Sequence, residues 1–254
     1  MTSLMTATIA LACLLAGAIG GMALRTVLPS THLDDESTNV IKLAVGMMAT
    51  LAALVLGLLI SSANTEHNLV ESEYRQTLAN VATLDRYLAD YGPDTREIRG
   101  LIRHSMVRQF QAIWPKDDFG PAEPTSADRK LAVEVLARQL LKLSPQGDAQ
   151  KWYLSQALQI TSELRAIGWI LSGQRIGSTL PTLSLVILVS WTSAIFLSFG
   201  LFTRPNPRVF VSLLIAALAV ASAILLILEL DNPFSGFIQI PSGGAHAILD
   251  VLGK

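Results

Sequence analysis

The sequence predicts an all-α, polytopic membrane protein with four transmembrane helices and a helical soluble domain between the second and the third. Three observations lead to this fold class. Only 15% of the 254 residues are charged, against about 25% in a typical soluble domain, and 51% are hydrophobic. Four apolar runs without internal charge are each long enough to cross a bilayer. The charges gather between the second and third runs, where residues 64–179 hold 14 basic and 14 acidic side chains, or 28 of the 39 in the chain.

The first predicted transmembrane pair occupies residues 1–63, with helices at about residues 4–24 and 43–63. The first run resembles a signal peptide in its N-terminal position and in the small residues at its end. No Lys or Arg precedes it, and its apolar part exceeds the usual length of about 7 to 15 residues, so we expect a retained membrane helix. Small residues recur at every fourth position, which allows close approach of another helix: Gly17 and Gly21 form one line, and Ala12, Ala16 and Gly20 form a second.

The second run is expected to begin a helix that continues far beyond the membrane. No proline occurs between Asp35 and Tyr91, and beyond Asn64 the apolar residues follow a near-heptad pattern. Within the apolar part, small and weakly polar residues form a stripe at helical spacing. Such a stripe is typical of helix packing, which is the commoner case, or of a pore lining. The candidate pore-lining residues are Gly46, Thr50, Ala53, Gly57 and Ser61, with Asn64 at the inner end.

Three acidic residues, Asp34, Asp35 and Glu36, precede this helix. Two interpretations are compatible. One of the aspartates caps the N-terminus of the helix, where carboxylates are favourable. In an oligomer, the three would also repeat around the axis as a vestibule that concentrates cations.

The soluble domain, residues 64–179, is expected to be continuous with the second transmembrane helix and to contain three further helices. Their predicted ranges are Asp94–Trp114, with Asp94 as its cap, Asp128–Leu143, and Asp148 to about Ser172. The first of these has an arginine-rich face that is either simply solvated or a contact for an acidic partner. That face contains Arg96, Arg99, Arg103 and Arg108.

The second transmembrane pair occupies residues 180–230, with helices at about 180–202 and 209–229, and residues 231–254 form a C-terminal tail. This plan places both termini and the soluble domain on one side of the membrane. The flanking positive charges do not decide which side. We expect the cytoplasmic side of a bacterial inner membrane, because translocation of such a domain without a signal-like first helix is unusual.

We do not expect an enzyme. We also expect no catalytic residue, no cofactor and no metal site. The segment GQRIGST lacks the Gly-Lys of a phosphate-binding loop, the four histidines are scattered, and Cys13 is the single cysteine. The net charge of −1 gives no reason to expect nucleic acid as a partner. Charged side chains are absent from the interior of the spans, which argues against a proton-coupled transporter but not against a channel.

Three stretches resemble the bacterial bestrophin-like family of unknown function, a distant relative of the bestrophin ion channels. They are His32–Ala63, Arg86–Arg103 and Leu228–Ile240. The resemblance implies a ring of identical subunits, a pentamer by analogy, that conducts inorganic ions through a pore lined by the second transmembrane helix. It also implies that an acidic-Pro-Phe-Gly segment after the fourth helix couples the soluble domain to the pore. That segment corresponds to Glu229, Asp231, Pro233, Phe234 and Gly236, with a serine inserted before the glycine.

Two departures limit what the resemblance implies. The sequence lacks the acidic cluster of the calcium site in animal bestrophins, and Thr50–Ser61 contains no Phe or Pro to match the aromatic neck. Two functions therefore stay open: an oligomeric ion channel, or a membrane-anchored interaction or sensor module whose soluble domain binds a protein partner without conduction. For a channel, the acidic vestibule favours selectivity for cations, and selectivity for anions is the alternative.

Overall fold

The structure, a computed structural model, describes five stretches of the chain, residues 3–27, 35–119, 129–174, 182–203 and 206–252. These residues form helices and no strand, which confirms the all-α fold class. The chain divides into two compact units. Unit 1 contains Met1–His67 and Ser178–Ile238, and unit 2 contains Asn68–Gly177 and Gln239–Lys254.

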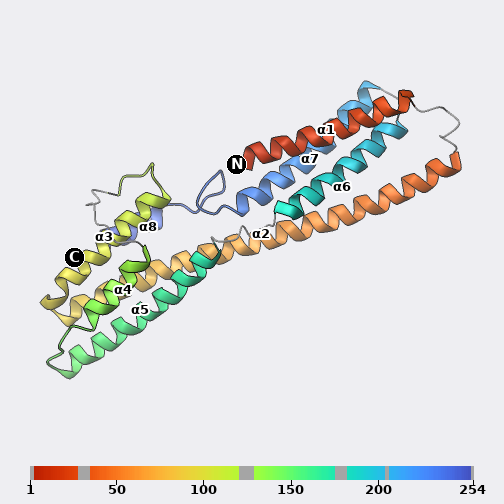
Figure 1. Cartoon of the computed structure of the whole chain (residues 1–254). Helices are drawn as coiled ribbons and strands as arrows, with labels where there is room; N and C mark the ends of the chain where they lie inside the picture. Colours follow the sequence, from red (N-terminus) through yellow and green to blue (C-terminus); the bar gives the residue numbers. More distant parts are fainter. Residues whose placement is uncertain (1–2, 28–34, 120–128, 175–181, 204–205, 253–254) are drawn as a thin grey trace. The chain divides into compact units, whose positions relative to one another are not determined.

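Unit 1 contains four helices that are long and apolar enough to cross a membrane, as predicted. They are α1 (Ser3–Val27), the first part of α2 (Asp35–Tyr91), α6 (Thr182–Phe202) and α7 (Pro207–Leu230). Figure 1 shows α1, α6 and α7 side by side, and a buried cluster of Leu14, Ala18, Phe196 and Ala217 joins these three. Acidic Asp34 lies outside the described residues, and α2 begins at the next position.

Helices α1 and α6 cross closely because glycines stand where they meet. A methyl group at Gly21 would overlap the carbonyl oxygen of Leu197, and one at Gly200 would overlap that of Ala18. Close approach of backbones is the main use of small residues in membrane helices. The line of Gly17 and Gly21 therefore faces α6. Gly20, on the second predicted line, has open space around it, so that line does not pack within the described chain.

Helix α2 is continuous from Asp35 to Tyr91, a length of 57 residues, which confirms the predicted extension beyond the apolar run. At a rise of 1.5 Å per residue it is roughly 85 Å long. It ends where predicted because Gly92 adopts a φ of 127°, a conformation that other residues rarely adopt, and Pro93 follows.

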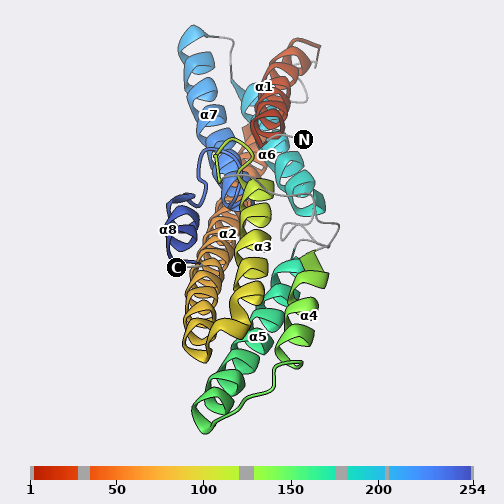
Figure 2. The same ribbon diagram turned by 90° about the vertical axis from the view of Figure 1, so that its left-hand side faces the viewer.

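Unit 2 continues from α2 through a short 3₁₀ turn, η2 (Pro93–Thr95), into four further helices. These are α3 (Arg96–Ile113), α4 (Arg129–Leu140), α5 (Asp148–Gln174) and, in the C-terminal tail, α8 (Gly243–Val251). Helix α4 lies beside α5, as Figure 2 shows. The near-heptad side of α2 forms the core, with Val70, Tyr74, Val81, Leu84 and Leu88 buried. Burial raises the pKa of Tyr74 to about 12, so this phenol is neutral at physiological pH.

The start of α3 differs from the prediction, because Asp94 does not cap it. The N-cap is Thr95, whose hydroxyl donates instead to the carbonyl oxygens of Leu88 and Gly92, at 2.5 and 2.8 Å. Thr95 is fully buried, so its hydroxyl needs these acceptors. This threonine therefore ties the end of α2 to the start of α3.

The predicted arginine-rich face of α3 also needs correction. Arg99 lies only 16% exposed and donates from Nε and Nη2 to the two carboxylate oxygens of Asp85 on α2, at 2.8 and 2.9 Å. This hydrogen bonding raises the pKa of the Arg99 guanidinium. Arg99 thus belongs to the α2–α3 contact, whereas Arg96 and Arg103 are exposed.

Candidate pore face and post-helix segment

Within unit 1, one side of α2 packs against α6 and α7. Val45 and Ala52 share a buried cluster with Ile195 of α6, and Ala63 shares another with Ile227 and Leu230 of α7. These contacts come from the residues of α2 that lie on one face at helical spacing. They fix which side of α2 turns toward the rest of its own chain.

The predicted stripe lies on a different side of the same helix. All six of its residues are exposed: Gly46, Thr50, Ala53, Gly57, Ser61 and Asn64. Among the described residues, no atom outside the helix lies within 4 Å of a methyl group placed at Gly46 or Gly57. The described part of this chain therefore places no helix against these two glycines. Both interpretations of the stripe, packing against a further helix and lining a pore, stay predictions.

Two threonine hydroxyls, one on the stripe and one beside it, bond to the backbone of their own helix. The Thr50 hydroxyl donates to the Gly46 carbonyl oxygen at 3.0 Å, and Thr65 donates to Ser61 in the same way at 2.9 Å. Such bonds let a hydroxyl face an apolar surrounding without an unmet donor. The stripe can accordingly offer hydroxyl and carbonyl oxygens without needing a fixed partner.

A third side of α2, next to the stripe, is exposed and strongly apolar. Leu54 and Leu58 are each 69% exposed, and Met47 is 64% exposed. At about 100° per residue, Leu58 lies a little over a quarter of a turn from Gly57 at nearly the same depth. Helix α2 therefore has two exposed faces in the described chain. The stripe has small side chains, and the face next to it has large apolar side chains.

Helix α2 is also the least covered of the four candidate spans. Only 11% of its most apolar 18-residue window is buried, whereas the corresponding windows of the other three helices are 22–28% buried. A lipid-facing helix on the outside of a bundle would need no small, weakly polar stripe.

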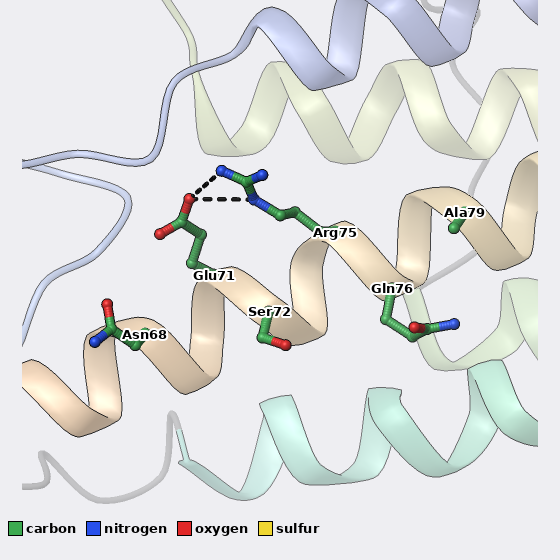
Figure 3. Close-up of a pocket in the computed structure, with 6 residues that line it drawn as sticks. All are labelled: Asn68, Glu71, Ser72, Arg75, Gln76 and Ala79. Atoms are coloured by element: carbon green, nitrogen blue, oxygen red, sulfur yellow. Dashed lines mark hydrogen bonds and ion pairs between the residues drawn. The ribbon is translucent and has the colours of Figure 1, made fainter.

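In unit 2, α2 carries a polar pocket that the sequence reasoning did not identify as a site (Figure 3). It is lined by Asn68, Glu71, Ser72, Arg75, Gln76 and Ala79. Glu71 accepts from Arg75 at 2.6 Å, the pairing expected for an i, i+4 couple, and Figure 3 shows the two side chains meeting on one side of the helix. The available signal was periodicity: Asn68, Glu71 and Arg75 continue the three-and-four spacing that runs from Gly46 to Asn64.

The acidic residues before α2 are only partly described. Asp34 is outside the described residues, while Asp35 and Glu36 belong to the first turn of α2. The predicted vestibule therefore stays a prediction. In the part of the chain that the structure describes, no group of three or more His, Cys, Asp or Glu residues is placed to hold a metal ion.

The segment after α7 folds back onto the end of that helix. Glu229 is buried at 5% exposure, and its Oε2 accepts a hydrogen bond from the backbone N–H of Phe237. Asp231 caps α7, and Pro233 and Phe234 lie within the turn that follows. Gly236, with a φ of 100°, lies directly against the Glu229 carboxylate. The structure thus brings together the predicted Glu229, Gly236 and the residue after it.

Four apolar spanning helices with an appended helical unit define an integral membrane protein of the all-α class. A family model described as the Bestrophin-like domain matches residues 12–244, and the chain therefore belongs to the Bestrophin-like family.

Two solved structures share this fold. Both are crystal structures of a bacterial bestrophin homologue from Klebsiella pneumoniae, each with one point mutation. The first has a TM-score of 0.65 at 13% identity and covers 99% of both chains. The second has a TM-score of 0.66 at 12% identity and covers 99% of this chain and 97% of its own. No curated protein matches the sequence significantly.

Proposed function

We propose that this protein is a homo-oligomeric ion channel whose pore is lined by the first part of α2. The observation that carries the proposal is the exposed stripe from Gly46 to Asn64, which lies on the least covered of the four candidate spans in the described chain. Rings of small, weakly polar or apolar residues are sufficient to conduct ions without buried charge. Membership of the Bestrophin-like family and the fold shared with bacterial bestrophin homologues support the same class of protein.

In this proposal, copies of the chain surround an axis, five by analogy with the bestrophins, and each contributes its α2. Asp34, Asp35 and Glu36 form the outer vestibule and favour cations over anions. Unit 2 lies in the cytoplasm of a bacterial cell. The segment from Glu229 to Gly236, which includes Asp231, Pro233 and Phe234, couples unit 2 to the membrane helices.

Purified protein in planar bilayers tests conduction. We expect discrete currents from the wild type and their loss in Gly57→Trp, because an indole on the stripe would fill a narrow pore. Leu58→Trp is the matched control, since it places the same bulk at the same depth on the neighbouring apolar face. A current lost in Leu58→Trp and kept in Gly57→Trp would move the pore to the leucine face. No current from the wild type under any ionic condition would reject the channel.

Cysteine accessibility gives a second measure of the same face. In a Cys13→Ala background, single cysteines at Ala53 and Gly57 should react with a charged, membrane-impermeant thiol reagent, and the reaction should reduce the current. Cysteines at Leu54 and Leu58 should react at least tenfold more slowly. Equal reaction rates at the two faces would contradict a water-filled stripe.

The alternative function is a membrane-anchored module that binds an acidic protein partner through α3. It is favoured by one observation, the exposure of Arg96 and Arg103 one above the other on that helix. On this alternative the protein does not conduct, and replacing both arginines with Glu should abolish partner binding while assembly and thermal stability stay unchanged.

A further inference from the structure

The carboxyl group of Glu229 is buried at the end of α7, just before a segment that is exposed. The side chain is 5% exposed in the last turn of α7, while Ser235, Gly236 and Phe237 are all exposed. An ionised carboxylate withdrawn from water is costly unless donors compensate it. The donor is the backbone N–H of Phe237, which lies 2.5 Å from Glu229 Oε2. The side chain thus bonds to the chain eight residues further on.

Gly236 allows this contact for two independent reasons. Its φ of 100° lies in a region that side-chain-bearing residues rarely adopt. A methyl group at this position would also overlap both carboxylate oxygens of Glu229 and the carbon between them. The carboxylate therefore occupies the space that a side chain at position 236 would need.

The turn between the two residues is closed by its own hydrogen bonds. Asn232 donates its backbone N–H to the carbonyl oxygen of Glu229 at 3.2 Å and its side-chain amide to that of Leu228 at 2.9 Å. Ser235 donates to the carbonyl oxygen of Asn232 at 3.1 Å. Glu229 accordingly accepts hydrogen bonds from both ends of the loop. Its backbone carbonyl binds the start of the loop, and its side chain binds the end.

This loop lies where the chain passes from one compact unit to the other. Unit 1 ends at Ile238 and unit 2 resumes at Gln239, two residues after the amide that Glu229 holds. The segment that follows enters the core of unit 2 through Ile240, which is 4% exposed. The hydrogen bond therefore lies at the place where the chain leaves α7.

We propose that Glu229 is a positioning residue: its carboxylate holds the Phe237 amide, with Gly236 as the required spacer, and so fixes the point at which unit 2 is joined to α7. We call this the Glu229 latch. The consequence for conduction rests on the channel function proposed above. The latch depends on the acceptor oxygen of Glu229 and on the backbone N–H of Phe237. It does not depend on the side chain of Phe237, a residue that is 81% exposed.

Hydrogen exchange measured by mass spectrometry on the full-length protein in detergent or nanodiscs tests the latch directly. Glu229→Ala should raise exchange in a peptide covering residues 232–240 by tenfold or more, while peptides from α1 and α6 stay unchanged. Phe237→Pro, which removes the donor, should do the same. Phe237→Ala keeps the N–H and should exchange like the wild type. Glu229→Gln keeps a neutral acceptor, so its exchange should rise only a fewfold, because charge-assisted bonds are roughly twice as strong.

Two results would overturn the latch: wild-type exchange in Glu229→Ala, or exchange in Phe237→Ala as fast as in Glu229→Ala. If Glu229→Ala does not assemble, the isosteric Glu229→Gln and the pair Phe237→Pro and Phe237→Ala answer the same question. In each case the exchange difference between variants that keep and lose the bond decides the outcome.

Single-channel recording separates the latch from the channel. Glu229→Ala should change the open probability severalfold and leave the single-channel conductance unchanged, with Glu229→Gln restoring most of the wild-type behaviour. An altered conductance would mean that Glu229 faces the pore and not the loop. An unchanged open probability despite faster exchange would reject the positioning role. Faster exchange in Glu229→Ala, together with a wild type that carries no current, would leave the latch in place and reject the channel.

Discussion

At the scale of single residues, Asp85 and Arg99 show how a charge pair serves the fold of unit 2. Their side chains are 5% and 16% exposed, and both carboxylate oxygens of Asp85 accept from the guanidinium. The pair between Glu71 and Arg75 is much more exposed, with Arg75 at 75%. Losing one member of a buried pair leaves an uncompensated charge, whereas exposed pairs contribute little.

Asp85→Ala is therefore expected to destabilise unit 2 by about 3–5 kcal/mol. Glu71→Ala on the same helix should cost at most about 0.5 kcal/mol. Thermal unfolding of the full-length protein in detergent, followed by circular dichroism, measures both. Similar melting temperatures for the two variants would show that the buried pair does not hold α2 to α3.

At the scale of elements, the contact between α1 and α6 depends on which glycine line faces it. Gly21 and Gly200 each stand against a backbone carbonyl of the partner helix, and Gly20 stands in open space. Because apolar side chains gain nothing from leaving a lipid surrounding, close backbone packing carries the association of membrane helices. A side chain at the contact would force the helices apart.

Gly21→Leu should accordingly disrupt the α1–α6 contact and lower the melting temperature by several degrees, with a reduced yield of folded protein. Gly20→Leu, one residue away, should leave both unchanged. Size-exclusion chromatography and thermal stability in detergent give the comparison. An equal effect of the two substitutions would contradict the assignment of the α6 contact to the line of Gly17 and Gly21.

The part of helix α2 in unit 1 has three faces with different surroundings. Its buried side binds α6 and α7, its stripe of small residues is open, and its leucine side is open as well. Lipid can cover the leucine side, so only the stripe of small, weakly polar residues supports the assembly proposed above.

At the scale of the whole molecule, the proposed function requires several copies of the chain. The chain has a mass of 27.3 kDa, so a pentamer has a protein mass of about 137 kDa. We expect light scattering with detergent correction, or native mass spectrometry, to give a closed oligomer. A protein that stays monomeric at all concentrations in lipid nanodiscs would exclude a pore formed by several copies of the stripe. That result would favour the anchored interaction module.

Much of this fold was predictable from sequence because partition between lipid and water depends on local composition. The four spans, the break at Gly92 and Pro93, and the length of α2 each depend on a contiguous stretch, and the structure confirms them. The near-heptad core of unit 2 followed from periodicity in the same way. The stripe from Gly46 to Ser61 was identified as a face, but its two interpretations could not be separated.

Sequence by itself thus determined which segments cross the membrane, which form the soluble unit and that one helix serves both. Only the tertiary structure decided which faces are covered. It placed Arg99 against Asp85 rather than in solvent, turned Gly21 rather than Gly20 toward α6, and set the Glu229 carboxylate on the Phe237 amide. The physical reason is that a helical period gives a residue its side of the helix, whereas its partner is supplied by another part of the folded chain.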